Sequence, residues 1–397
     1  MNNLHILIVG LGRINKLNND GGFIRLQQII RSLSQTPSIY ITLYISVRDL
    51  QNFSMFHGKN VTIQVLKDVP WFGDSRLLNY IYRTIRGFFY LAFSKERYDV
   101  VYCPSDFFHD FLPSLAYKMT HPMCRLFTCM FLIAHHPWKS YESAFLHETQ
   151  YQDRKSFIQR TGQLFFYLTQ RLMMPLIKKY STQVLVLNGF DKNNLIVRGF
   201  PAERITVVSM GINYKDIKNA KPLINSDYAA GYVGRLHPQK GLFLLLLAWR
   251  KVVSLQPTLK LFIIGGGSLS EQNQLQETIV RYNLQNNVVY LGFKPNQEIY
   301  AYIKATRLLV VPSYYESWGQ VVAEGLACEV PVVTFSIPAF KEVFQDKLIY
   351  AKMYDDNDLA SKILTTLNNN ANPTNCDLQK FDWSKVAERE LSILANN

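Results

Sequence analysis

The chain has 397 residues, of which 48% are apolar, so it can bury two hydrophobic cores and we expect two domains. Its 43 Lys and Arg against 30 Asp and Glu give a formal charge of +13, which indicates an acidic partner: nucleotide phosphates, an anionic membrane surface or nucleic acid. No nucleic-acid-binding motif is present, no apolar run approaches the ~20 residues of a membrane span, and the five cysteines lack disulfide or zinc spacing, as is typical of a reducing cytoplasm.

Short apolar runs separated by longer segments predict a parallel sheet in the first half of the chain. The expected strands are 4–9, 39–47, 61–66, 98–102, 125–134 and 183–187. Because the chain opens directly on the first of these, we expect no signal peptide. Gly10 and Gly12 begin a G-x-G pattern, but Asn15 stands where its third glycine belongs, which argues against a nicotinamide or flavin site.

Two features of the first half are candidate ligand contacts. Gly21 and Gly22 precede a helix expected from Phe23 to Leu33; a ligand approaching the backbone requires glycine, and a flexible loop tip is the alternative. His135 and His136 follow the expected strand 125–134. An imidazole at that point can contact a ligand, and a structural histidine is the alternative for each.

Two segments of the first half interleave aromatic and basic residues at helical spacing. They are residues 75–97 and 154–180, and we expect Pro175 to kink or break the second. Such helices pack on a sheet with a solvated basic face, or they lie on anionic lipid with their cations at the headgroups. Both interpretations remain open, and the second predicts peripheral contact with an anionic membrane.

A polar segment rich in Lys and Asn, residues 214–228, shows neither helical nor strand periodicity and marks the domain boundary. We expect an N-terminal domain of residues 1–214, a second domain of residues 215–378 and a C-terminal helix within residues 379–397.

The second half repeats the strand–loop–helix pattern. A strand at 230–233 leads into Gly234, Arg235 and Lys240, and the two cations of this loop can bind a phosphate group, with an ordinary basic surface loop as the alternative. A Walker loop needs Ser or Thr after its lysine, but Gly241 follows Lys240, which argues against ATP hydrolysis.

Two later strands end in weaker candidates. The strand 260–264 runs into three glycines centred on Gly266, which let a backbone approach a nucleotide or simply form a tight turn. Lys294 follows the expected strand 288–292.

Residues 313–331 read SYYESWGQVVAEGLACEVP and follow an apolar strand at 307–313. Glu316 and Glu324 are separated by seven residues, and Gly319 argues against one continuous strand between them. We therefore expect Glu316 in a loop and Glu324 in a helix over residues 320–328. The free N–H groups at its start, from Ser317, Trp318, Gly319, Gln320 and Val321, can bind a phosphate while the carboxylates bind hydroxyl groups. An ordinary strand–helix unit with two solvated glutamates is the alternative.

This stretch resembles the signature S-x-x-E-S-F-G-x-x-x-x-E-A-x-A-x-G-x-P-V of retaining glycosyltransferases of the glycosyltransferase family 4 type, with Gly325 in place of Ala and Glu329 in place of Gly. Residues 234–241 match the family's G-R-L-x-x-x-K-G, and residues 381–384 are similar to its f-s-W pattern before the last helix. The resemblance covers nearly the whole chain and is tightest over residues 230–345.

The resemblance implies the GT-B fold, an α/β architecture with two Rossmann-like, doubly wound parallel-sheet domains facing across a cleft and a C-terminal helix that crosses back to the first domain. It assigns Arg235 and Lys240 to the donor diphosphate, the amides of Gln320 and Val321 to the same group, Glu324 to the ribose hydroxyls and Glu316 to the transferred hexose. Gly21 and Gly22 would approach the donor phosphates, and His135 or His136 would lie near the donor sugar and the acceptor. The remaining donor-binding candidates are Gly234, Gly266, Lys294, Ser317, Trp318 and Gly319.

The implied activity is transfer of a hexose, with retention of configuration, from a UDP- or GDP-linked sugar to a glycan or lipid-linked acceptor in surface polysaccharide or glycolipid synthesis. No cofactor, obligatory metal or nucleic-acid partner is expected, and the implied location is the cytoplasm or the inner face of its membrane. Asp356 and Asp358 form a D-x-D, but Asp358 directly precedes the expected helix 359–367 and suits its N-cap or first turn. The alternatives are a nucleotide-sugar 2-epimerase, disfavoured by residues 316–319, and a non-catalytic membrane scaffold, disfavoured by the intact Arg235 and Lys240.

Overall fold

The computed structural model describes residues 3–12, 21–58, 60–68, 75–134, 157–224, 226–369 and 376–396. These residues form two compact units. The first contains the described residues up to 210 together with 383–396, and the second contains those between 211 and 382. The predicted boundaries were 214/215 and 378/379.

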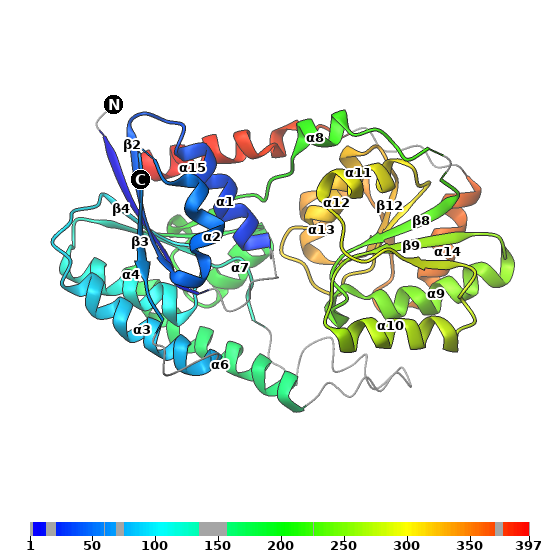
Figure 1. The fold of residues 1–397 in the computed structure, drawn as a ribbon, viewed down its shortest axis with the longest axis horizontal. Helices are drawn as coiled ribbons and strands as arrows, with labels where there is room; N and C mark the ends of the chain where they lie inside the picture. The colour runs from blue at the N-terminus through cyan, green and yellow to red at the C-terminus, as the bar shows by residue number, and fades with distance from the viewer. Residues whose placement is uncertain are drawn as a thin grey trace. The chain divides into compact units, whose positions relative to one another are not determined.

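The first unit is built on a seven-stranded parallel sheet in the order β3-β2-β1-β4-β5-β6-β7 (Figure 1). The four central positions of β1 and all of β4 are buried, because helices cover both faces of the sheet. The strands are β1 (Leu4–Gly10), β2 (Ile39–Ser46), β3 (Val61–Leu66), β4 (Val100–Cys103), β5 (Arg125–Cys129), β6 (Gln183–Val186) and β7 (Ile205–Val207). β5 is shorter than the predicted strand 125–134, and β7 was not predicted as a strand.

Helices cover the two faces of this sheet as right-handed crossovers require. The helices are α1 (Gly21–Leu33), α2 (Leu50–Phe53), α3 (Arg76–Ala92), α4 (Phe108–Thr120), α6 (Phe157–Tyr180), α7 (Gly189–Val197) and α15 (Trp383–Asn396). α1 and α15 lie on one face and α3, α4 and α6 on the other (Figure 1). None of the helices in the described ranges combines the length and apolar character that crossing a bilayer requires.

We predicted a kink or a break at Pro175, and the helix does not break there, because α6 continues through this residue to Tyr180. Proline removes one hydrogen bond of the helix ladder. Met173 and Met174 before it and Ile177 after it are all buried in the core of the first unit, so burial on both sides of the proline holds the helix together.

The second unit has a six-stranded parallel sheet in the order β10-β9-β8-β11-β12-β13 (Figure 1). Its strands are β8 (Tyr228–Val233), β9 (Lys260–Ile264), β10 (Val288–Tyr290), β11 (Leu309–Val311), β12 (Val332–Phe335) and β13 (Ile349–Ala351). Its helices are α8 (Tyr214–Asn219), α9 (Leu242–Leu255), α10 (Leu269–Arg281), α11 (Asn296–Lys304), α12 (Gln320–Ala327), α13 (Pro338–Val343) and α14 (Asp356–Asn368). α9, α10 and α14 cover one face, and α11, α12 and α13 cover the other (Figure 1).

α8 corrects the expectation that residues 214–228 lack helical structure. Its single buried side chain is Ile217, and Lys304 Nζ donates hydrogen bonds to the carbonyls of Lys218 (3.1 Å) and Ala220 (2.8 Å) at its C-terminal end. A lysine from another helix therefore stabilises the C-terminal end of α8, although the sequence of α8 has no amphipathic pattern. Sequence periodicity does not reveal such a contact.

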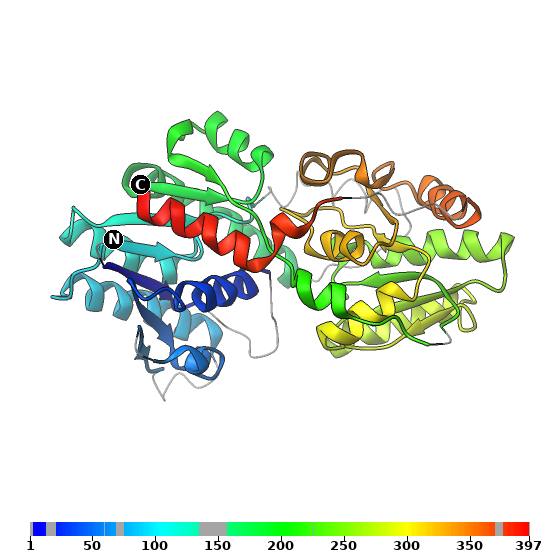
Figure 2. The same ribbon diagram turned by 90° about the horizontal axis from the view of Figure 1, so that it is seen from above.

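The C-terminal helix packs on the first unit as predicted, beside α1 (Figure 2). Its Glu390 is buried and forms an ion pair with Arg25 of α1. Tyr102 of β4 donates to Glu390 Oε1 at 2.7 Å, and Arg25 also donates to Tyr102 Oη and to the carbonyl of Ser209, both at 3.1 Å. The polar groups of this buried pair are therefore satisfied from several elements.

We expect Glu390→Ala to destabilise the first unit by about 3–5 kcal/mol, since it leaves the Arg25 guanidinium buried without a carboxylate. Denaturant unfolding followed by tryptophan fluorescence and circular dichroism measures the change. Glu388→Ala, an exposed position of the same helix, is the matched control and should change stability little. Equal effects of the two variants would contradict the assigned role of the Arg25–Glu390 pair.

Candidate functional site

The predicted donor residues of the second unit follow the carboxyl ends of its strands, and most of them lie where its strand order reverses. β9 and β10 follow β8 on one side of the sheet, whereas β11, β12 and β13 lie on the other. In open α/β sheets the carboxyl edge at such a switch point is the usual place for a nucleotide. Gly234, Arg235 and Lys240 follow β8, Gly266 follows β9, Lys294 follows β10, and Glu316, Ser317, Trp318, Gly319, Gln320 and Val321 follow β11.

The loops after β8 and β11 are bound to each other. Tyr314 N–H donates to the Gln239 carbonyl at 2.9 Å, and Gln239 Nε2 donates to the Tyr315 carbonyl at 2.9 Å. Gly241 has φ +69°, and a Cβ there would lie 1.9 Å from the Pro312 carbonyl oxygen. Only glycine fits this contact, so Gly241 fixes how closely the two loops approach.

Lys240 and Glu316 form an ion pair across these loops. The lysine side chain is 21% exposed and the glutamate side chain 18%, so the pair lies at the surface of the carboxyl edge rather than in the core. Ser313 Oγ also donates to Glu316 Oε1 at 3.0 Å. Two of the predicted residues, 76 positions apart in the chain, are thus brought into direct contact.

The glycines after β8 and β9 allow a second close approach. A Cβ at Gly265 would lie 1.7 Å from the Gly234 carbonyl oxygen, and one at Gly267 would lie 2.8 Å from Leu236 Cβ. Gly266, the predicted residue, would meet no atom within 4 Å. Gly265 and Gly267 are therefore required by loop packing, whereas Gly266 is the glycine with open space beside it.

α12 begins at a glycine cap. Gly319 has φ +96°, and a Cβ there would lie 2.4 Å from Phe340 Cε1. The preceding Trp318 is 2% exposed, and its ring packs edge-to-face against Phe344 and Phe381 with centroids 5.7 and 4.9 Å apart. Because the ring is buried, Trp318 can contact a sugar donor only through its backbone.

Glu324 lies in the second turn of α12 and is 7% exposed. Gln320 Nε2 donates to its Oε1 at 3.0 Å. Burial raises the pKa of Glu324 from 4.5 to about 7, and the hydrogen bond from Gln320 opposes part of that rise. The group therefore titrates near neutral pH.

Two departures from the family signature have structural reasons. A Cβ at Gly325 would lie 2.6 Å from Leu309 Cδ2, so glycine lets α12 pack closely on β11. Glu329 has φ +62°, in the region that favours glycine, and its carboxylate pairs with Lys218 Nζ at 2.5 Å.

The remaining candidates belong to other elements or lie outside the described residues. Lys294 Nζ pairs with Glu298 at 3.1 Å, and Gly21 and Gly22 are exposed at the start of α1 in the first unit. His135 and His136 lie outside the described residues.

The D-x-D sequence belongs to the start of α14. Asp355, not Asp358, is the N-cap; Asp356 and Asp358 lie in the first turn, and Asp356 forms an ion pair with Lys251. Within the described ranges, no group of three or more His, Cys, Asp or Glu side chains is placed to hold a metal ion.

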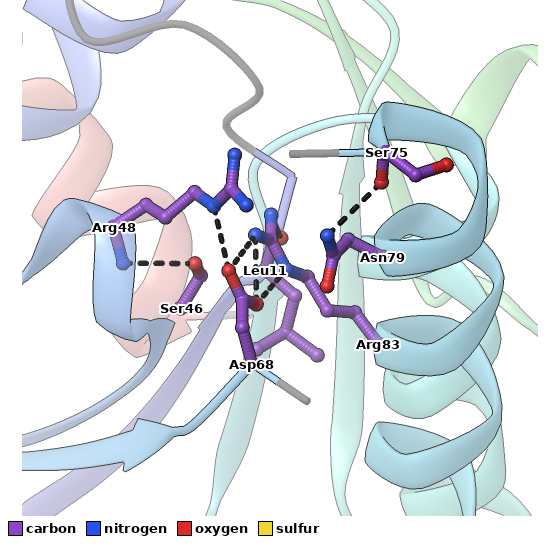
Figure 3. Close-up of polar contacts among 7 residues, drawn as sticks. All are labelled: Leu11, Ser46, Arg48, Asp68, Ser75, Asn79 and Arg83. Carbon is purple, nitrogen blue, oxygen red and sulfur yellow. Dashed lines mark hydrogen bonds and ion pairs between the residues drawn. The ribbon is translucent and has the colours of Figure 1, made fainter. Parts of the chain in front are cut away.

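The carboxyl edge of the first sheet carries a polar cluster that sequence reasoning missed (Figure 3). Asp68 accepts from Arg48 Nε at 2.6 Å and from Arg83 Nε and Nη2 at 2.9 Å, and Arg83 Nη1 donates to the Leu11 carbonyl at 3.4 Å (Figure 3). Arg48 follows β2, Asp68 follows β3 and Arg83 lies in α3. Because the three residues come from different elements, no local sequence motif indicates the cluster.

Two buried carboxyl groups lie at the same edge. Asp110 accepts from Leu11 N–H at 2.8 Å and Ser105 Oγ at 2.5 Å, and burial raises its pKa to about 7. Asp106 accepts from Gln170 Nε2 at 2.6 Å, and burial raises its pKa to about 6. Ser105 and Asp106, which follow β4 shortly after its carboxyl end, are the local sequence signal that could have indicated this site.

The second unit matches a known family. Residues 213–381 match the family described as Glycosyl transferases group 1. Over 198 residues the chain is 29% identical to an uncharacterized glycosyltransferase of Methanocaldococcus jannaschii, covering 48% of this chain and 52% of that protein. Over 187 residues it is 29% identical to the capsular polysaccharide biosynthesis glycosyltransferase CapM of Staphylococcus aureus, covering 44% of this chain and 48% of that protein. The chain thus matches about half the length of these curated relatives.

The whole chain is similar in structure to Anabaena HepE in complex with UDP and glucose. The TM-score is 0.70 with 17% sequence identity, covering 99% of this chain and 100% of that one. At this identity the likeness shows the fold, which is GT-B. The prediction of a GT-B fold is confirmed, and the match of residues 213–381 to the glycosyl transferases group 1 family agrees with the resemblance of the sequence.

We expect the stability of the second unit to depend on pH through Glu324. Because its pKa is higher in the folded chain, the protonated carboxyl stabilises the fold below the unfolded value of 4.5, and this contribution is lost as the pH rises through about 7. The shift corresponds to a free energy on the order of 3 kcal/mol. Glu324→Gln should match the wild type at about pH 4 to 5 and unfold at a higher temperature near pH 8.

Scanning calorimetry at both pH values measures this difference. Glu277→Gln, at an exposed position of α10, is the control and should show no such pH-dependent gain. If Glu324→Gln and the wild type differ equally at both pH values, Glu324 does not carry the raised pKa.

Proposed function

We propose that this protein is a glycosyltransferase of the family 4 type, which moves a hexose with retention of configuration from a nucleotide-diphosphate sugar to a glycan or lipid-linked acceptor. The observation that carries the proposal is the contact between Lys240 and Glu316 at the switch point of the second sheet. It places a cation suited to phosphate beside a carboxylate suited to sugar hydroxyls, in the unit that matches the glycosyl transferases group 1 family.

The diphosphate would bind between the β8 loop and the start of α12. Arg235 is exposed and Lys240 partly exposed, so both cations are accessible to a donor. The amides of Gln320 and Val321 belong to the first turn of α12, where the helix dipole favours an anion. Phosphate oxygens would compete with Glu316 for Lys240, and the charge that the leaving diphosphate gains in the transition state would strengthen this interaction.

The two glutamates would hold the sugars. Glu316, released from Lys240 by the phosphate, would accept hydrogen bonds from the transferred hexose, and Glu324 would accept from the ribose hydroxyls. We propose that the acceptor attacks from the face that the diphosphate leaves, with the departing phosphate taking the acceptor proton, so that no metal or other cofactor is needed. Gly21 and Gly22 would approach the donor phosphates, and His135 or His136 the acceptor.

The acceptor would bind at the carboxyl edge of the first sheet, around Arg83, Ser105 and Asp110. A role in surface polysaccharide or glycolipid synthesis is supported by the relative CapM, which is named for capsular polysaccharide biosynthesis. The HepE structure, which contains UDP, supports a nucleotide-linked donor. We propose that the protein works in the cytoplasm, with peripheral contact to the anionic face of the membrane.

We expect UDP or GDP to raise the unfolding temperature of the wild-type protein, since a ligand that binds the folded state stabilises it by mass action. Lys240→Ala should lose most of this shift because it removes a phosphate contact. Lys260→Ala is the control: this lysine begins β9, at the amino edge of the same sheet, and should leave the shift unchanged. If neither nucleotide shifts the wild-type transition, the proposed donor site is wrong.

Turnover tests the reaction itself. Incubation with UDP- and GDP-linked hexoses should release nucleoside diphosphate from one of them, and NMR of the transferred or hydrolysed sugar should first show the anomer of the donor. Lys240→Ala should lower kcat by roughly 10²-fold or more, since it removes charge stabilisation of the leaving group. An inverted product would contradict the retaining mechanism.

A further inference from the structure

α3 exposes a continuous apolar stripe to solvent. Leu78, Ile81, Ile85 and Phe89 follow one another at spacings of three or four residues, so they lie on one side of the helix, and all are exposed. Phe93, at the C-cap, is 78% exposed and stacks on Phe89 with ring centroids 6.5 Å apart. Folding of the described residues leaves this face uncovered, and a contiguous exposed apolar patch of this kind indicates an interaction site.

α6 continues the same surface. Phe165, Leu168 and Leu172 form a second exposed stripe at helical spacing, and Leu172 is 65% exposed. Phe165 lies against Tyr80 of α3, with ring centroids 6.5 Å apart, and α4 packs against both helices. The two stripes therefore belong to one layer, on the face of the first sheet that α3, α4 and α6 cover (Figure 1).

The charged side chains of α3 and α6 have one sign. Neither α3 nor α6 contains an Asp or Glu, whereas each contains several Arg or Lys. Arg86 is exposed beside the α3 stripe, and Arg171, Lys178 and Lys179 are exposed along α6. Their aliphatic stems can lie along apolar surface while their charges reach outward.

We infer that this surface, formed by the exposed apolar residues of α3 and α6 with Arg86, Arg171, Lys178 and Lys179, lies on an anionic lipid bilayer. The inference deepens the proposed function, because it identifies the part of the chain that contacts the membrane. Apolar side chains bordered by cations are what an interfacial helix inserts among acyl chains and anionic headgroups.

A second copy of the chain fits this surface poorly. In a two-fold contact the same patch lies on both partners. The basic residues of one copy would then face those of the other, and neither helix supplies a carboxylate to pair with them. Anionic lipid both buries the apolar stripes and neutralises the cations.

Co-sedimentation with lipid vesicles tests the inference. The full-length protein should bind vesicles of phosphatidylcholine mixed with phosphatidylglycerol, bind vesicles of phosphatidylcholine alone far more weakly, and lose binding as salt is raised. Arg171→Glu with Lys178→Glu should lower the partition coefficient at least about tenfold, since each cation near an anionic surface contributes about 1 kcal/mol. Ile85→Ser with Phe89→Ser should lower it comparably by removing the inserted apolar groups.

Matched variants separate this surface from the charge and apolarity of the whole protein. Arg389→Glu with Lys215→Glu changes the net charge equally at exposed positions elsewhere, and Leu255→Ser with Val280→Ser removes exposed apolar residues of the second unit. Both should bind vesicles like the wild type, and all variants should keep the wild-type circular dichroism spectrum. The inference is overturned if the wild type ignores anionic vesicles or if the α3 and α6 variants bind as it does.

Sedimentation velocity tests whether a second copy of the chain binds this surface instead of lipid. If Ile85→Ser with Phe89→Ser dissociates a dimer and leaves vesicle binding intact, the surface is a self-association interface and the inference is wrong. Vesicle binding without sugar transfer would support this inference and contradict the proposed function. Sugar transfer without vesicle binding would support the proposed function and contradict this inference.

Discussion

The ion pair between Lys240 and Glu316 is the contact on which the candidate site depends. It joins the loops after β8 and β11, the two strands that flank the point where the second sheet reverses its order. Gly241 allows the two loops to approach each other closely. Gln239 accepts a hydrogen bond from one residue of the facing loop and donates one to another. The charged pair is therefore positioned by backbone geometry, so that a ligand meets groups whose conformational entropy is already reduced.

The second unit was largely predictable because its signals are local. Each strand is a short apolar run, and the residues that meet at the switch point directly follow the strands β8, β9 and β11. In a parallel sheet the carboxyl ends share one edge, so Lys240 and Glu316 were both expected at that edge, and the pairing of β8 with β11 brings them into contact. The packing role of Trp318 was not readable, because its partners Phe344 and Phe381 lie in later segments.

The first unit was less predictable for the same physical reason. Its strands gave clear patterns, but its polar edge is assembled from Arg48, Asp68 and Arg83, each on a different element. Helix α6 passes through Pro175 because of tertiary burial, which outweighs the local rule. The basic and aromatic spacing of α3 and α6 was evident from the sequence, but which side chains face solvent was settled only by the fold.

The first unit is discontinuous in the chain, since residues up to 210 are completed by α15 from the far end. The two connecting segments run side by side: Ile212 N–H donates to the Phe381 carbonyl at 2.8 Å, and Ile212 forms a parallel bridge with Asp382. A polypeptide that ended after Met210 would lack α15, and Arg25 would then be without its partner Glu390. Splicing Met210 to Trp383 through a few linker residues would instead give an autonomous N-terminal half, and the excised segment would be an uninterrupted C-terminal half.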